Sequence, residues 1–127
     1  MRIAVIGNQD SGKSTIIGVL TKGEGDNGQG SARVSVFNTK NEVQSGLTTS
    51  IAYELIGYTE DCQQIFPDRP VANKQERWEY LVEHSHHFLL FLDMCGHQRY
   101  LKTTMYGLVG HMPDYSMVIV AANKSFR

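Results

Sequence analysis

Residues Gly7–Ser14 have the sequence GNQDSGKS and match the pattern G-x-x-x-x-G-K-[ST]. The stretch before them, Arg2–Gly7, is short, apolar and β-branched, which predicts a buried strand. The stretch after them, Lys13–Leu20, predicts a helix. The core residues expected on this helix are Ile16, Ile17, Val19 and Leu20. Because a tight turn from strand to helix leaves backbone N–H groups free at the positive helix end, the stretch predicts a phosphate-binding loop.

The residues of this loop have distinct expected roles. Backbone N–H groups from Asp10 to Ser14 bind phosphate oxygens. Lys13 bridges the terminal phosphates and offsets charge during catalysis, and the Ser14 hydroxyl completes the coordination of Mg²⁺. Thr15 lies near the α-phosphate. The alternative is a glycine-containing turn that binds no ligand.

A second motif, Asp93-Met94-Cys95-Gly96, has the pattern D-x-x-G. It ends the apolar stretch Phe88–Asp93, which predicts a strand buried on both faces. Beside a phosphate-binding loop, the Asp93 carboxylate is expected to support the Mg²⁺ shell. Gly96 is expected to turn its N–H group toward a γ-phosphate. His97 follows directly, where an imidazole orients an attacking water molecule.

A third segment, Gly46-Leu47-Thr48, follows a flexible glycine-rich loop at Thr21–Ala32. The Thr48 hydroxyl is a candidate Mg²⁺ ligand, and its N–H group a candidate contact to the γ-phosphate. Thr49 competes for the same role, and an ordinary loop threonine is the alternative.

The remaining chain predicts one domain of the α/β class. Apolar strands alternate with helices, which indicates a P-loop NTPase three-layer sandwich with a mostly parallel central sheet. Residues Arg33–Ser45 fit either a short helix or an irregular segment. The other expected elements are a strand at Ser50–Tyr58, an insertion loop at Thr59–Asn73, helices at Lys74–Ser85 and Arg99–Gly110, and a fully buried strand at Ser116–Ala122.

Composition excludes several classes of protein. The 127 residues carry a net charge of −1, which provides no basic surface for DNA. The chain contains no apolar run near the roughly 20 residues of a membrane span. Two cysteines are too few for a disulfide scaffold, which favours a cytoplasmic location. His84, His86 and His87 lack metal-ligand spacing and are expected to be surface residues.

Together, the three motifs resemble those of the translation-factor-type GTPases, which carry G-x-x-D-x-G-K-[ST], a switch G-x-T and D-x-x-G-H. Longer stretches look like the subfamily of GTP-binding protein 1 and GTP-binding protein 2, relatives of elongation factor 1-alpha. These stretches are Gly7–Arg33, Gln44–Tyr58 and Tyr100–Asp114.

The resemblance implies GTP or GDP as ligand, Mg²⁺ as cofactor, His97 as the catalytic histidine, and the ribosome or ribosome-associated factors as partners. It implies Mg²⁺ contacts from Ser14 and Thr48, with Asp93 supporting the metal. The nucleotide-binding residues that it implies are Asn8, Gln9, Asp10, Ser11, Gly12, Lys13, Ser14, Thr15 and Gly96.

Some positions depart from the pattern of that family. Leu47 stands where the subfamily tends to have arginine, and Cys95 replaces a small residue or proline. The guanine-reading N/T-K-x-D segment is missing, since Asn123-Lys124-Ser125-Phe126 ends in phenylalanine and comes one strand–helix unit too early. Residues 1–127 are therefore expected to be a single partial G domain, truncated before its last strands.

The first hypothesis is a conformational switch that binds GTP and hydrolyses it to GDP and phosphate. The alternatives are a nucleotide-binding or phosphate-binding regulatory module without turnover, a fragment without base selectivity, and an adenine-nucleotide ATPase.

Overall fold

A sheet in the strand order β3-β2-β4-β1-β5 forms the centre of the computed structural model, which describes residues 1–122. The elements in chain order are β1 (Arg2–Gly7), α1 (Lys13–Lys22), α2 (Ser31–Val34), α3 (Lys40–Ser45), β2 (Ala52–Tyr58), β3 (Gln64–Ile65), α4 (Lys74–His84), β4 (His87–Asp93), the 3₁₀ helix η1 (Gln98–Tyr100), α5 (Leu101–His111) and β5 (Tyr115–Ile119).

Most strands of the sheet run in one direction. Strand β1 is parallel to both of its neighbours, β4 and β5, whereas β2 is antiparallel to β3 and β4. The register pairs Val5 with Asp93, so the ends of β1 and β4 meet at one edge. Ligands of open α/β sheets bind at the carboxyl ends of parallel strands. The expected α/β fold with a mostly parallel sheet is confirmed.

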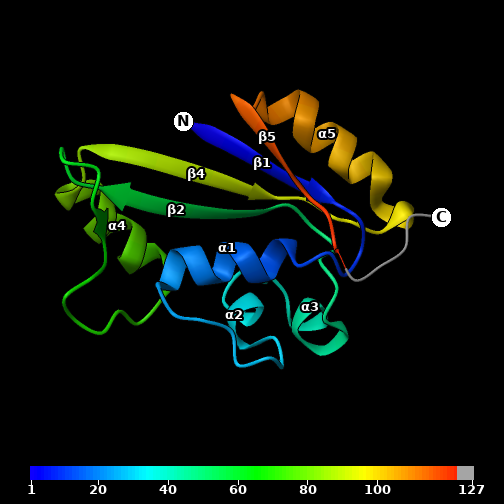
Figure 1. Ribbon diagram of the computed structural model, residues 1–127, viewed down its shortest axis with the longest axis horizontal. Helices are drawn as coiled ribbons and strands as arrows, with labels where there is room; N and C mark the ends of the chain where they lie inside the picture. The colour runs from blue at the N-terminus through cyan, green and yellow to red at the C-terminus, as the bar shows by residue number, and fades with distance from the viewer. Residues whose placement is uncertain (123–127) are drawn as a thin grey trace.

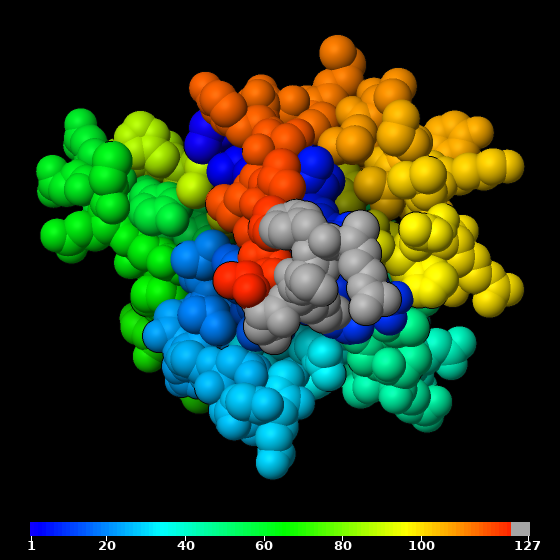
Figure 2. All heavy atoms as spheres, turned by 45° about the vertical axis from the view of Figure 1, so that its right-hand side comes forward, coloured from blue at the N-terminus to red at the C-terminus, as the bar shows by residue number. Residues whose placement is uncertain are grey.

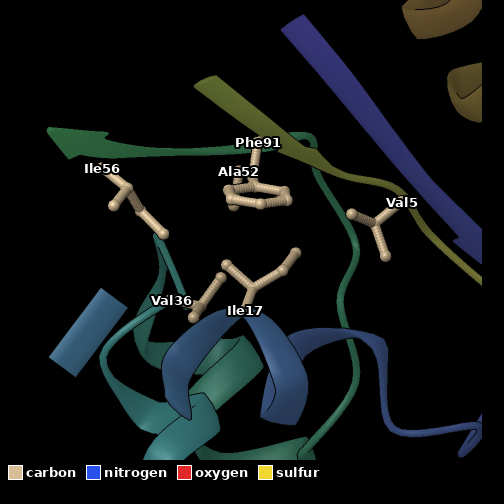
Figure 3. Packing of buried hydrophobic residues seen from close by; sticks show 6 residues of the cluster. All are labelled: Val5, Ile17, Val36, Ala52, Ile56 and Phe91. Atoms are coloured by element: carbon tan, nitrogen blue, oxygen red, sulfur yellow. The ribbon is translucent and has the colours of Figure 1, made fainter. Parts of the chain in front are cut away.

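Helices cover both faces of the sheet, which gives three layers (Figure 1). Helices α1 to α4 lie on one face and α5 lies on the other. Under α1, Ile17 packs against Val36 and Phe91 in a buried cluster that also contains Val5, Ala52 and Ile56 (Figure 3). On the α5 side, a second cluster contains Ala4, Leu92 and Met94.

Helix α1 buries a different face from the one predicted. Ile17 is fully buried as expected, but Ile16 and Leu20 are each 38% exposed. The face toward the core also carries Ser14, Gly18 and Thr21. These positions follow helical spacing from Ile17. Gly18 has no side chain at a point where α2 packs closely, since a Cβ there would collide with the Ala32 carbonyl group.

Two predicted segments differ in detail. The expected loop at 59–73 contains β3, which forms a short hairpin with β2; the pairing covers only two residues, too few to show an alternating pattern. Strand β5 was expected to be fully buried, yet Val118 is 62% exposed, because within residues 1–122 β5 pairs with β1 alone and forms the sheet edge.

The ambiguous segment Arg33–Ser45 contains the end of α2 and the whole of α3. The segment Asn123–Phe126, singled out above for its lack of an aspartate, lies outside the described residues. Among residues 1–122, every helix is too short or too polar to cross a membrane.

Candidate nucleotide-binding site

The loop after β1 meets two other segments at one end of the sheet. In Figure 2, blue atoms from the start of the chain emerge between the yellow atoms near residue 100 and the blue-green atoms of α3. A cavity lies at this junction. The predicted nucleotide-binding residues that line it are Gln9, Asp10, Gly12, Lys13, Ser14, Thr15 and Gly96. Thr48 and His97 line it as well.

The start of α1 is suited to bind an anion. Its N-cap is Gly12, so no side chain caps the free N–H groups of the first turn. The first turn also lacks an acidic residue that would repel an anion. Backbone N–H groups and the positive end of the helix dipole therefore remain available for phosphate oxygens.

Three side chains from the three motifs meet behind this helix start. The Ser14 Oγ donates a hydrogen bond of 2.5 Å to Asp93 Oδ2, and it lies 3.0 Å from Thr48 Oγ1. Thr49 does not share this position, because its hydroxyl donates to Glu42 Oε1 at 3.2 Å. The geometry thus separates the two competing threonines, and Thr48 is the one beside Ser14.

The donor set fits a Mg²⁺ ion. Two hydroxyl oxygens and one carboxylate are the hard oxygen ligands that this ion prefers. Asp93 is 1% exposed, and its Oδ1 is buried without a hydrogen-bond partner among residues 1–122. Burial raises the pKa of Asp93 to about 6, against the lowering effects of the Ser14 hydrogen bond and the Lys13 charge. A nearby cation would favour the ionised carboxylate and offset this cost of burial.

The phosphate-binding loop itself holds the Lys13 side chain in place. It is 6% exposed, and its Nζ donates a hydrogen bond of 2.8 Å to the Asn8 carbonyl oxygen. Burial lowers the pKa of Lys13, although Asp93 acts in the opposite direction. Gly96 packs against the same two groups, because a Cβ there would meet Lys13 Nζ and lie 2.7 Å from the Asn8 carbonyl oxygen. The second motif thus touches the phosphate-binding loop directly.

The His97 ring is oriented by the backbone of the 3₁₀ helix that follows it. Its Nδ1 accepts a hydrogen bond of 3.0 Å from the Arg99 N–H group. Since Nδ1 is the acceptor, the neutral ring carries its proton on Nε2. The ring also contacts Tyr100 in an edge geometry, with centroids 6.0 Å apart. A fixed imidazole with one free nitrogen can orient a water molecule.

Some predicted residues lie outside the cavity. Asn8 and Ser11 do not line it; Asn8 acts through its carbonyl on Lys13, and the Ser11 N–H donates to Asn8. Asp93 lies behind Ser14 rather than at the cavity wall. His84, His86 and His87 are exposed, as expected of surface residues.

Two residues near the site, Arg33 and Glu42, were not predicted from the sequence. Arg33 lines the cavity, and Leu47 lines it too, at the position flagged for its lack of a charge. Glu42 is 1% exposed and holds the segment beside Thr48: its carboxylate accepts N–H hydrogen bonds from Thr49 at 2.8 Å and from Ser50 at 3.0 Å. A capping box signal, Thr39-x-x-Glu42, marks the start of α3 in the sequence and is present in the structure.

The Glu42 network predicts a loss of stability in acid. Burial alone would raise the pKa of Glu42, but hydrogen bonds from Thr49, Ser50 and Asn38 lower it from 4.5 to about 2. A lowered pKa stabilises the fold fully above pH 4.5, and this contribution disappears as the pH falls toward 2. This contribution to the free energy of unfolding is about 3 kcal/mol.

Urea unfolding of the wild type and of Glu42→Gln tests this prediction, with Glu83→Gln on the exposed face of α4 as the control. The difference in unfolding free energy between wild type and Glu42→Gln should shrink as the pH falls below 4.5. A difference that stays constant over that range would contradict the role of the carboxylate.

Comparison with known proteins adds to this geometry. Residues 1–127 match the family described as the elongation factor Tu GTP binding domain. The chain is 43% identical over 124 residues to GTP-binding protein 1 of Xenopus laevis and, equally, to GTP-binding protein 2 of Mus musculus and of Homo sapiens. These matches cover 97% of this chain but only 19% of the first relative and 20% of the other two, so the chain spans about a fifth of their length. The chain belongs to the family of elongation factor Tu GTP-binding domains.

Proposed function

We propose that the protein hydrolyses GTP to GDP and phosphate and uses the reaction as a conformational switch. Family membership supports GTP as the ligand. The observation that carries the proposal is the meeting of Ser14, Thr48 and Asp93, because it joins the phosphate-binding loop to both segments expected to respond to the γ-phosphate.

In this proposal, Ser14 and Thr48 bind Mg²⁺ through their hydroxyl oxygens and Asp93 supports the ion. When bound, Mg²⁺ neutralises charge on the phosphate oxygens. Lys13 adds a second positive charge at the terminal phosphates. His97 holds the attacking water through the ring nitrogen that Arg99 leaves free.

The switch follows from how Thr48 is held. Thr48 lies between α3 and β2, and its hydroxyl lies against Ser14 Oγ, 34 residues away in the chain. With triphosphate bound, the threonine is fixed by metal and phosphate as well as by Ser14. After hydrolysis those additional contacts are lost, and the segment is released.

By analogy with translation factors, the whole protein is proposed to act with the ribosome in the cytoplasm. Such partners accelerate a reaction that is slow alone, on the order of 10⁻⁴ to 10⁻² s⁻¹. Base selectivity is proposed to come from residues other than those that line the cavity, since they belong to the segments expected to contact phosphate and Mg²⁺ and to their neighbours.

Single-turnover release of phosphate from GTP tests the proposed function in the full-length protein with ribosomes present. We expect release that requires Mg²⁺ and is lost with ATP as substrate. Tight GTP binding without release of phosphate under these conditions would contradict hydrolysis and favour a regulatory module without turnover.

Removal of the Thr48 hydroxyl is expected to weaken the dependence of GTP binding on Mg²⁺. Thr48→Val keeps the side-chain shape but loses the oxygen 3.0 Å from Ser14, so we expect about a tenfold loss in Mg²⁺-dependent GTP affinity. Thr49→Val is the matched control, because its hydroxyl contacts Glu42 instead. The control should lower stability without changing the Mg²⁺ dependence. Equal Mg²⁺ dependence in the wild type and in Thr48→Val would exclude Thr48 as a ligand.

A further inference from the structure

A second cationic side chain faces the phosphate cavity from an unexpected element. Arg33, from the short helix α2, lines the cavity together with Lys13 and His97. Its guanidinium makes no hydrogen bond or ion pair with any of residues 1–122, although it is partly buried. Partly buried arginines usually pair with an acceptor, because five N–H donors must be satisfied. This arginine therefore has donors left for a ligand.

Close packing fixes the place of Arg33. Helix α2 lies directly on α1, since a Cβ added at Gly18 would collide with the backbone carbonyl of Ala32. That contact anchors the residue immediately before Arg33. Helix α1 also carries Lys13 and Ser14 at its start. One helix therefore fixes the position of Arg33 relative to the phosphate-binding loop.

Two glycines hold the guanidinium itself. A Cβ at Gly30 would lie 2.5 Å from Arg33 Nε, and a Cβ at Gly46 would lie 3.2 Å from an Nη atom. Both glycines have positive φ, 88° and 67°, which side chains rarely adopt. The guanidinium thus lies between the N-cap of α2 and the C-cap of α3.

Hydrogen bonds in the loop before α2 stabilise the position of Arg33. The Asp26 carboxylate accepts hydrogen bonds from the N–H groups of Gly28 at 2.9 Å, Gly30 at 3.2 Å and Ala32 at 2.9 Å. One carboxylate therefore shapes the glycine-rich turn that leads into Arg33. Asp26 is a positioning residue in this arrangement.

The location indicates which part of a nucleotide the arginine meets. Gly46 lies two residues before Thr48, whose hydroxyl is beside Ser14. Arg33 is therefore next to the segment that is expected to respond to the γ-phosphate. A guanidinium offers two parallel N–H donors that match phosphate oxygens.

We propose that Arg33 binds the terminal phosphates of the nucleotide and makes the site prefer triphosphate over diphosphate. It acts as a second cation in the cavity that Lys13 lines, and it comes from α2 rather than from the phosphate-binding loop. The proposal rests on the proposed function, because it assigns a residue to the same nucleotide site.

Competition binding in the presence of Mg²⁺ tests the proposal, with GTP and GDP displacing a fluorescent guanine nucleotide from the full-length protein. For Arg33→Ala we expect GTP affinity to fall about tenfold or more and GDP affinity to change much less. The GTP affinity of Arg33→Lys should lie between those of the wild type and Arg33→Ala, because lysine keeps the charge but not the paired donors. Arg69→Ala, which removes an arginine with a 64% exposed side chain on the loop before α4, should bind like the wild type.

A second variant tests whether any loss of GTP affinity in Arg33→Ala comes from disturbed packing rather than from the missing charge. Arg33→Met retains an unbranched stem between the two glycines and should lose GTP preference as Arg33→Ala does. An unchanged ratio of GTP to GDP affinity in both variants would overturn the proposal and leave the proposed function intact. Failure of the wild type to bind either nucleotide would overturn both.

Discussion

Replacing Lys13 with methionine is expected to lower the affinity of the protein for GTP by about 100-fold to 1000-fold. Lys13 is 6% exposed and lines the phosphate cavity, where the only hydrogen bond of its ammonium group within residues 1–122 is to the Asn8 carbonyl oxygen. Charge-assisted hydrogen bonds to phosphate are strongest where water is excluded. Isothermal titration with GTP and Mg²⁺ measures the loss, and Lys22→Met, at the exposed end of α1, is the control.

Lys13→Met also distinguishes a role of Lys13 in GTP binding from a role in the stability of the fold. Burial lowers the pKa of Lys13, so its charged form is disfavoured by folding. A group with a lowered lysine pKa destabilises the fold while it is charged, and the penalty decreases as the pH rises toward the ordinary value of 10.5. Lys13→Met should therefore unfold at a higher temperature than the nucleotide-free wild type at neutral pH. Reduced stability together with unchanged GTP affinity would assign Lys13 a structural role only.

Replacing His97 with alanine is expected to reduce ribosome-stimulated GTP hydrolysis by about 10²-fold to 10⁴-fold while GTP affinity stays within about threefold. The imidazole accepts a hydrogen bond from the Arg99 N–H group and lines the cavity, but it is not part of the phosphate-binding loop. Single-turnover phosphate release and equilibrium binding, measured on the same preparation, distinguish the two effects.

His84→Ala provides the matched control for this experiment, since His84 is an exposed histidine at the end of α4. It should hydrolyse GTP like the wild type. Stimulated turnover that survives in His97→Ala would remove His97 from the mechanism. Loss of GTP binding in that variant would instead assign it to the nucleotide pocket.

The phosphate-binding loop could be predicted because its signals are local. A buried strand, a glycine-rich turn and a helix lie consecutively, and the structure has β1 and α1 at those positions. The neighbourhood of Asp93 was also predictable, since parallel strands end at the same edge of a sheet and Val5 pairs with Asp93. The roles assigned to these residues remain predictions to be tested.

Features that depend on long-range packing could not be predicted from local patterns. Apolar spacing favoured Ile16 and Leu20 as core residues, but α2 covers the other side of α1, where Gly18 permits close approach. Arg33 directly follows the glycine-rich loop Thr21–Ala32 and begins the segment Arg33–Ser45, which fits either a short helix or an irregular segment and carries no local signal for a site. Its place in the cavity follows from contacts with Gly30 and with Gly46, the latter 13 residues away in sequence.

Glu42 shows a similar limit. Its capping box with Thr39 is a local signal, but its hydrogen bonds to Thr49 and Ser50 depend on the return of the chain after α3. A single buried carboxylate thus positions the segment that carries Thr48. No local pattern distinguishes such a carboxylate from an ordinary cap.

If Mg²⁺ couples the phosphate-binding loop to Thr48, the site recognises a triphosphate. Competition of GTP, GDP and tripolyphosphate against a fluorescent guanine nucleotide, with Mg²⁺ and with chelator, tests it most directly. We expect GTP to displace the probe better than GDP when Mg²⁺ is present, and chelation of Mg²⁺ to remove this preference. Equal displacement by GTP and GDP, unaffected by Mg²⁺, would contradict it.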